Sequence, residues 1–269
     1  MDAGLTVPAL AGRKVAGGSA PLVMVTAYDA PGARLVDEAG AEIILVGDSL
    51  GMVVLGYDTT LQVTMDDMAR HTAAVARTSP RALVVTDMPW LSYHGERAET
   101  LANAATLVRA GAAAVKLEGG RRRVGAVEAL LDAEIPVMGH IGLTPQSFHT
   151  LGGFRVQGRS PAAGAALVDD ARALADAGVF AIVVEGVPAE VAAEITAAVP
   201  VPTIGIGAGP HCDGQVLVFH DVLGLEDRLV PRFVRRYASL RQDGVKAIAA
   251  FAADVRSGAF PSERESYHR

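Results

Sequence analysis

The stretch EAGAEIILVGD, residues 38–48, carries the pattern that decides the fold. The end of a predicted helix and a glycine are followed by a short, strongly apolar run, and this run is followed by an acidic residue. The same order recurs as RAGAAAVKLEG at 109–119 and DAGVFAIVVEG at 176–186. A glycine at a helix C-terminus commonly adopts a left-handed conformation, so each copy predicts a tight helix-to-strand connection. The three glycines concerned are Gly40, Gly111 and Gly178.

Outward from these copies, short apolar runs alternate with Ala-rich amphipathic stretches along the whole chain. The predicted strands span 22–28, 42–48, 82–87, 113–119, 136–140, 180–186, 202–209 and 215–221. The predicted helices span 30–39, 65–78, 95–110, 123–134, 161–177, 188–198 and 232–257. Strands that are apolar on both faces and separated by helices indicate a parallel sheet covered by helices. Eight such strands predict a closed (β/α)₈ TIM-type barrel, and no Gly-rich fingerprint supports a Rossmann fold.

The bulk properties suit one large soluble enzyme domain. The chain has 269 residues, of which 50% are hydrophobic, and we expect an N-terminal extension at 1–21 and a barrel catalytic domain at 22–269. The net charge of -6 argues against nucleic acid or an anionic membrane as the main partner. Cys212 is the only cysteine, and neither a signal pattern nor a membrane-spanning apolar stretch is present, so we expect a cytoplasmic protein.

Two long connections, 49–63 and 141–160, follow the second and fifth predicted strands. Long loops within a compact domain are usually lids or binding loops. In a barrel both would lie at the C-terminal face, where active sites are built.

Polar residues end most of the predicted strands, and a barrel would bring them to one mouth. They are Asp48 and Ser49, Asp87, Lys116 and Glu118, His140, Glu185, and His220 and Asp221. Any one of them alone fits a loop residue or a helix N-cap. Polar residues at the ends of six strands favour a functional site instead.

Three carboxylates in one mouth repel one another, by on the order of 4 kcal/mol per pair at about 4 Å and an effective dielectric of about 20. One lysine, Lys116, cannot offset this repulsion. The remaining negative charge must therefore be neutralised by bound protons or by a cation. Oxygen ligands without a Cys or paired-His set favour Mg²⁺ over zinc. We therefore predict that Asp48, Asp87 and Glu118 bind Mg²⁺, either directly or through water.

A divalent cation beside a lysine suits a substrate with two oxygen donors, such as a 2-oxo acid. The metal would stabilise the enolate formed when the neighbouring carbon loses a proton. That step needs a base, and Glu185 is the candidate, with a salt-bridged strand end as the alternative. His140 either orients the substrate or a water, or is simply packed at its strand end. Tyr28 either borders the pocket or belongs to the core.

Several blocks closely resemble the ketopantoate hydroxymethyltransferase family, from about residue 22 to the C-terminal SGAFPSERESYH. The matching blocks are VTAYD (25–29), LVGDSLGMVVLGYDTTLQVT (45–64), HTAAV (71–75), RAGAAAVKLEGG (109–120), PVMGHIGLTPQS (136–147), GGFRVQGR (152–159), PTIGIGAG (202–209) and DGQVLVFHD (213–221). GDSLGM and the GHIGLTPQS…GGFRVQGR pair are long and specific. The segment ahead of the first strand and the PHCDG loop depart from the family pattern.

The resemblance implies a TIM-type barrel in a large homo-oligomer, typically a homodecamer. It implies transfer of a hydroxymethyl group from the co-substrate 5,10-methylenetetrahydrofolate to 3-methyl-2-oxobutanoate, giving 2-dehydropantoate in pantothenate biosynthesis. It places one Mg²⁺ per subunit on Asp48 and Asp87, completed by Glu118. It also implies that Lys116 contacts the substrate, that Ser49 and the two aspartates line its pocket, and that Glu185 is the general base.

Three other hypotheses stay open at this point. Lys116 as a Schiff-base nucleophile is disfavoured because nearby carboxylates keep a lysine protonated. A phosphoenolpyruvate mutase or isocitrate lyase type of Mg²⁺-dependent barrel would need a loop cysteine, whereas Cys212 lies after the seventh strand. A barrel kept only for binding would be expected to lose a metal or base carboxylate, and none is lost.

Overall fold

The computed structural model describes residues 4–228 and 231–269, and within them the strands β1 to β8 form a closed barrel in chain order. The strands are β1 (Leu22–Thr26), β2 (Ile43–Val46), β3 (Leu83–Asp87), β4 (Ala114–Glu118), β5 (Val137–Gly142), β6 (Ala181–Glu185), β7 (Thr203–Ile206) and β8 (Gly214–Leu217). All neighbours are parallel, and β1 closes on β8 with Val25 opposite Leu217. The predicted (β/α)₈ TIM-type barrel is confirmed.

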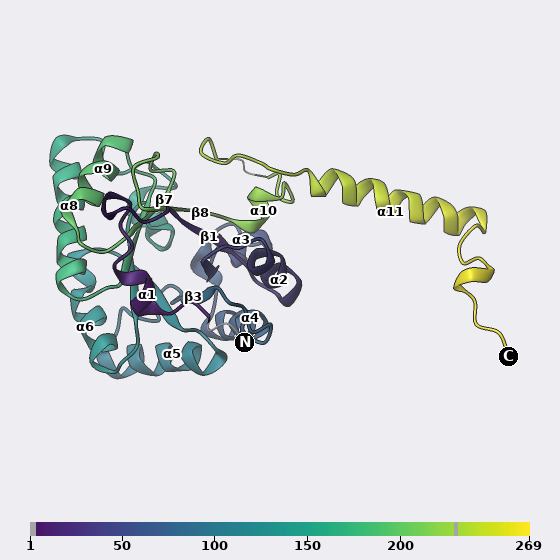
Figure 1. Ribbon diagram of the computed structural model, residues 1–269, viewed down its shortest axis with the longest axis horizontal. Coiled ribbons are helices and arrows are strands. Elements are labelled where there is room, and N and C mark those ends of the chain that lie inside the picture. Colours follow the sequence, from purple (N-terminus) through teal and green to yellow (C-terminus); the bar gives the residue numbers. More distant parts are fainter. Residues whose placement is uncertain (1–3, 229–230) are drawn as a thin grey trace. The chain divides into compact units, whose positions relative to one another are not determined.

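A helix follows each of the first six strands and packs outside the sheet (Figure 1). These helices are α2 (Ala30–Glu38), α4 (Met65–Ala76), α5 (Arg97–Ala110), α6 (Val124–Asp132), α8 (Pro161–Asp176) and α9 (Ala189–Ala198). The predicted glycine turns are confirmed, because all three glycines have positive φ. Gly111 has φ 111°, and a Cβ there would lie 2.4 Å from the Cβ of Ala76, so no larger residue fits.

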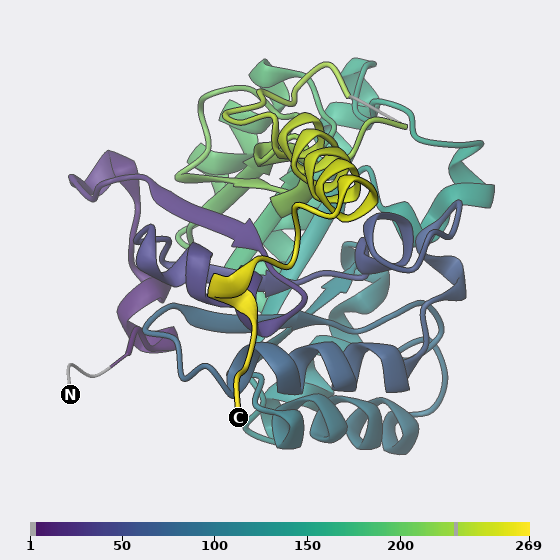
Figure 2. The ribbon, with the colours of Figure 1, turned by 90° about the vertical axis from the view of Figure 1, so that its right-hand side faces the viewer.

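Shorter helices lie before β1, in the connections between strands and after β8, and Figure 2 shows the ribbon turned by 90°. They are α1 (Val7–Ala11), η1 (Val15–Gly17), α3 (Leu50–Val53), η2 (Thr60–Gln62), η3 (Arg121–Arg123), η4 (Pro145–Ser147), α7 (Phe148–Leu151) and α10 (Phe219–Val222). The two long loops predicted at 49–63 and 141–160 thus contain single helical turns.

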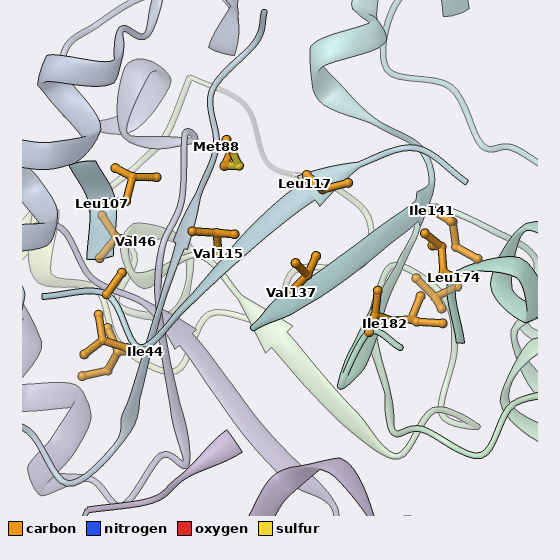
Figure 3. Close-up of a cluster of buried hydrophobic side chains, with 14 of the residues drawn as sticks. Ile44, Val46, Met88, Leu107, Val115, Leu117, Val137, Ile141, Leu174 and Ile182 are labelled. Carbon is orange, nitrogen blue, oxygen red and sulfur yellow. The ribbon is translucent and has the colours of Figure 1, made fainter. Parts of the chain in front are cut away.

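Alternation along each strand divides the buried side chains into two sets. One set faces the surrounding helices and includes Val115 and Leu117 of β4, which Figure 3 shows near other outward side chains such as Val137. The other set fills the barrel interior and includes Ala114 of β4 and Met138 of β5. Because the side-chain period of a strand is two, Lys116 and Glu118 share the interior face with Ala114.

The segment before β1 is packed onto the barrel unit. Leu10 of α1 is fully buried in the same cluster as the interior residues Leu22 and Met24. Lys14 forms an ion pair of 2.7 Å with Asp213, which directly precedes β8. Residues of this segment therefore belong to the core of the barrel unit.

Residues 220–269 form a second compact unit, containing α11 (Leu240–Ser257) and η5 (Glu263–Glu265). The helix predicted at 232–257 begins later than expected, because the backbone N–H of Tyr237 donates to Val222 O and that of Leu240 to Leu223 O. In the part of the chain that the structure describes, no helix is long and apolar enough to cross a membrane.

The prediction that His220 and Asp221 end the last strand is wrong. The β1–β8 ladder stops at Leu217, and the N–H of Phe219 donates at 2.9 Å to the side-chain hydroxyl of Thr26, the last residue of β1. His220 and Asp221 lie in α10 and belong to the second unit.

Candidate active site

The interior face of the barrel changes from apolar to charged near the C-terminal ends of the strands. Asp87 is the last residue of β3, Glu118 the last of β4 and Glu185 the last of β6. Lys116 and His140 occupy interior positions of β4 and β5 and are buried. The structure therefore brings these five predicted residues together at one end of the barrel.

Asp48 reaches this cluster from two residues beyond β2. Its backbone N–H donates to Asp87 Oδ2 at 3.1 Å, and its side chain is buried. The intervening Gly47 permits the turn, since a Cβ there would lie 2.8 Å from the Ser49 hydroxyl. Ser49 Oγ is 2.9 Å from the Tyr28 hydroxyl, and Tyr28 is also buried in the hydrophobic core cluster, so its position fits both expected alternatives.

Lys116 is the buried cation of the cluster. Its Nζ lies 2.9 Å from Asp87 Oδ1, with both side chains about 5% exposed or less. Burial lowers the pKa of Lys116, but the charges of Asp87, Glu118 and Asp48 outweigh burial and raise that pKa overall. The side chain is thus an ammonium ion, which is the wrong form for a Schiff-base nucleophile.

His140 connects the two glutamates. Its Nε2 lies 3.2 Å from Glu185 Oε2, and its Nδ1 lies 3.4 Å from Glu118 Oε1 and 3.1 Å from Lys116 Nζ. Burial and the Lys116 charge lower the pKa of His140, but hydrogen bonds to Glu118 and Glu185 prevail and raise it to about 9. The protonated ring forms ion pairs with both glutamates, whereas the Lys116 contact is a hydrogen bond only when Nδ1 carries no proton.

The carboxylates carry more negative charge than the site neutralises. Burial, then the charges of Asp87 and Glu118, raise the pKa of Asp48 well above its ordinary value. Burial also raises the pKa of Asp87 despite its bond to Lys116. A cation beside Asp48 and Asp87 would relieve this repulsion, so the two residues fit a hard divalent metal.

Glu118 is less free to bind a metal directly. Its Oε2 accepts the backbone N–H of Gln146 at 2.9 Å, and its Oε1 faces His140. Within residues 4–228 and 231–269, no group of three or more His, Cys, Asp or Glu side chains forms a metal cage. The fit to a cation therefore depends on Asp48 and Asp87, with Glu118 acting at most through water.

Gln146 and Tyr93 belong to the cluster but were not predicted from the sequence. Gln146 Nε2 donates to Asp48 Oδ2 at 2.8 Å, and the Tyr93 hydroxyl donates to Gln146 Oε1 at 2.6 Å. Both residues are buried, Gln146 in η4 and Tyr93 in a turn between β3 and α5. The block GHIGLTPQS was recognised as specific, but nothing local in it assigns a role to the glutamine.

Comparisons with known proteins identify a family and relatives that match nearly the whole chain. The family model described as ketopantoate hydroxymethyltransferase matches residues 5–263. The chain is 56% identical over 264 residues to 3-methyl-2-oxobutanoate hydroxymethyltransferase of Moorella thermoacetica, covering 98% of this chain and 97% of that protein. It is 58% identical over 246 residues to the protein of the same name from Pyrobaculum arsenaticum, covering 91% and 93%.

Solved structures with low identity share the fold. A 2,3-dimethylmalate lyase, described as a PEP mutase/isocitrate lyase superfamily member, has a TM-score of 0.62 at 17% identity, covering 98% of this chain and 92% of that chain. Phosphonopyruvate hydrolase, in a complex with oxalate and Mg²⁺, has a TM-score of 0.59 at 17% identity, covering 97% and 93%. The family match, the long relatives and the barrel agree: the chain belongs to the ketopantoate hydroxymethyltransferase family.

Proposed function

We propose that this protein transfers a hydroxymethyl group from 5,10-methylenetetrahydrofolate to 3-methyl-2-oxobutanoate, giving 2-dehydropantoate in pantothenate biosynthesis. The observation that carries the proposal is the buried set Asp48, Asp87, Lys116 and Glu118 at the barrel mouth, with Glu185 bonded to the same cluster through His140. The names of the long relatives point to the same reaction.

One Mg²⁺ per subunit is the cofactor of the proposal. Asp48 and Asp87 would hold it, with Glu118 contributing through water, because their excess negative charge calls for a hard cation. When bound, Mg²⁺ supplies Lewis-acid stabilisation of the negative charge that develops on a 2-oxo acid.

Glu185 is the proposed general base. Its carboxylate is 16% exposed, more than any other member of the buried cluster, so it can reach a substrate while keeping its bond to His140. Water releases the one-carbon unit from the folate as formaldehyde, which leaves tetrahydrofolate. Glu185 removes the proton from C3 of the oxo acid, C3 forms a bond to the formaldehyde carbon, and the formaldehyde oxygen takes up a proton to become the new hydroxyl. The His140 ring lies 3.2 Å from Glu185 Oε2, so a protonated His140 would hold the carboxylate by charge.

Lys116 and Ser49 are the proposed substrate-binding groups, together with the two aspartates. The Lys116 ammonium offers positive charge to an anionic oxo acid, because its other partners do not use all three of its N–H groups. Ser49, paired with Tyr28, presents a hydroxyl at the same mouth.

A phosphoenolpyruvate mutase or isocitrate lyase type of reaction remains the alternative, but Cys212 does not support it. Cys212 is buried two residues before β8 begins, at the end of the barrel opposite the carboxylate cluster. Burial, its largest influence, raises the pKa of this thiol, which disfavours the reactive thiolate.

We also propose that the protein works as a cytoplasmic homodecamer without nucleic acid or membrane partners. Residues 22–269 are proposed to act as the catalytic domain, with 1–21 as an N-terminal extension. The net charge of -6 and the family membership support these assignments.

The test follows the C3 proton of 3-methyl-2-oxobutanoate by ¹H NMR in D₂O, with and without EDTA and methylenetetrahydrofolate. We expect metal-dependent loss of the signal, and formation of 2-dehydropantoate once folate is added. Glu185→Gln should abolish exchange, while Glu190→Gln, an exposed glutamate on α9, should leave it unchanged. Proton exchange that continues unchanged in EDTA would refute the role of the metal. Failure to form 2-dehydropantoate in the presence of methylenetetrahydrofolate would refute the proposed reaction.

A further inference from the structure

Gln146 contacts two of the proposed metal-site carboxylates at once. Its backbone N–H donates to Glu118 Oε2 at 2.9 Å, and its side-chain Nε2 donates to Asp48 Oδ2 at 2.8 Å. The residue is 5% exposed and lies 98 positions from Asp48 in the chain. One loop residue therefore holds both carboxylates from the β5 side of the mouth.

The orientation of the amide group is fixed by a backbone carbonyl. Nε2 also lies 2.9 Å from Met88 O, and a carbonyl oxygen can only accept a hydrogen bond. The amide nitrogen must therefore face Met88, and its second N–H points at Asp48 Oδ2. Reversing the amide would place an oxygen against both a carbonyl and a carboxylate.

Tyr93 holds the other side of the amide. Its hydroxyl donates to Gln146 Oε1 at 2.6 Å and accepts the backbone N–H of Glu118 at 3.1 Å. Burial raises the pKa of the Tyr93 phenol, so its proton stays in place as a donor. The guanidinium carbon of Arg123 lies 5.7 Å from the centre of the ring and supports it from outside the cluster.

Gln146 is also electrically neutral, which matters in this cluster. A lysine or arginine at this position would neutralise Asp48 and compete with a metal ion for it. The amide instead directs Oδ2 by a hydrogen bond and leaves the carboxylate charge for a cation. Residues that orient metal-binding carboxylates in this way strongly influence metal affinity.

We propose that Gln146, held by Tyr93, is the positioning residue that sets the divalent-metal affinity of the Asp48–Asp87 site. This inference rests on the metal site of the proposed function. It assigns a role to a residue that the proposed chemical step does not use.

The test measures the affinity of the full-length protein for Mg²⁺ by calorimetry and for Mn²⁺ by the EPR signal of the free ion, without substrate. Gln146→Met keeps the side-chain length but removes the amide, and we expect affinity to fall by about 10- to 100-fold. Gln215→Met is the matched control, because Gln215 is exposed and its side chain donates to Gly209 O on the far side of β8. It should bind metal as the wild type does.

A double-mutant cycle separates positioning from general loosening of the loop. Tyr93→Phe should weaken metal binding less than Gln146→Met does, and the double variant should bind about as weakly as Gln146→Met alone. High Mg²⁺ should restore most of the turnover of Gln146→Met, because mass action refills a weakened site. A loss that excess Mg²⁺ leaves unchanged would overturn the positioning role.

Wild-type metal affinity in folded Gln146→Met would also overturn the proposal. If that variant fails to fold, Tyr93→Phe decides, and unchanged metal affinity in it has the same meaning. A wild-type protein that binds neither ion would refute the metal of the proposed function itself. The two failures are thus distinguished by the wild-type titration.

Discussion

Lys14 Nζ and Asp213 Oδ2 form an ion pair of 2.7 Å that joins the segment before β1 to the start of β8. Asp213 also accepts the backbone N–H groups of Val15 and Thr203, and Lys14 also donates to Thr196 O. The two ends of the barrel sequence are therefore connected through one buried carboxylate.

Lys14→Met should destabilise the fold by about 3 kcal/mol, because it leaves the Asp213 carboxylate buried with its main cation gone. Urea denaturation measures the change in the free energy of unfolding. Arg13→Met is the control: its 3.6 Å pair with Glu42 is more exposed and should contribute less than about 1 kcal/mol. Equal effects of the two substitutions would contradict a special role for Lys14.

Leu10→Ala should also destabilise the barrel, by about 2–4 kcal/mol, since Leu10 is fully buried against interior residues and its loss leaves a cavity. Thermal and urea unfolding report the change. Leu35→Ala removes the same atoms from a leucine that is 55% exposed and should change stability by less than about 1 kcal/mol. A stable Leu10→Ala protein would mean that α1 does not contribute to the core.

Lys116→Met should lower turnover by about a hundredfold or more, because a buried positive charge facing the developing anion is lost. Borohydride added with 3-methyl-2-oxobutanoate should leave Lys116 unmodified in the wild type, as shown by mass spectrometry of the intact protein. A reduced adduct on Lys116 would instead establish a Schiff base and refute the charge-stabilising role.

The protonated His140 should stabilise the metal-free fold in a defined pH window. Its pKa is raised from 6.5 to about 9, so the folded state holds the proton more tightly than the unfolded state. The resulting stability is complete below pH 6.5 and is lost as the pH rises through about 9.

In EDTA, the Tm advantage of the wild type over His140→Gln should therefore shrink between pH 6.5 and 9. The exposed His149 provides the control, since His149→Gln should show no such trend. An advantage of His140 that grows with pH would mean that the neutral ring is the stabilising form.

Local sequence patterns were sufficient for the barrel. Apolar runs such as 43–46 identify buried parallel strands, and the glycine before three of these runs marks the turn from helix to strand. The end of β8 was misjudged because it depends on Thr26, a partner almost two hundred positions away. The start of α11 was misjudged because the N–H of Tyr237, inside the predicted helix, donates to Val222 O instead of to a carbonyl one helical turn earlier.

The charged members of the site were predictable because a carboxylate or lysine at the end of a buried apolar strand is uncommon and therefore indicates a function. The structure brings Asp48, Asp87, Lys116, Glu118 and Glu185 together, while their roles in binding and catalysis stay predictions. Gln146 was not predictable, because an amide in a loop acquires meaning only from the positions of Asp48, Met88 and Tyr93 around it.

The two-residue alternation along β4 makes the site intolerant of length changes within that strand. Deleting one residue from the Ala114–Glu118 strand would rotate Lys116 and Glu118 outward against the helices and turn Val115 and Leu117 into the mouth. Loops can lengthen or shorten without this penalty, so inherited insertions and deletions should be confined to them. The spacing of the lysine and the glutamate is thus fixed by the same geometry that builds the wall of the barrel.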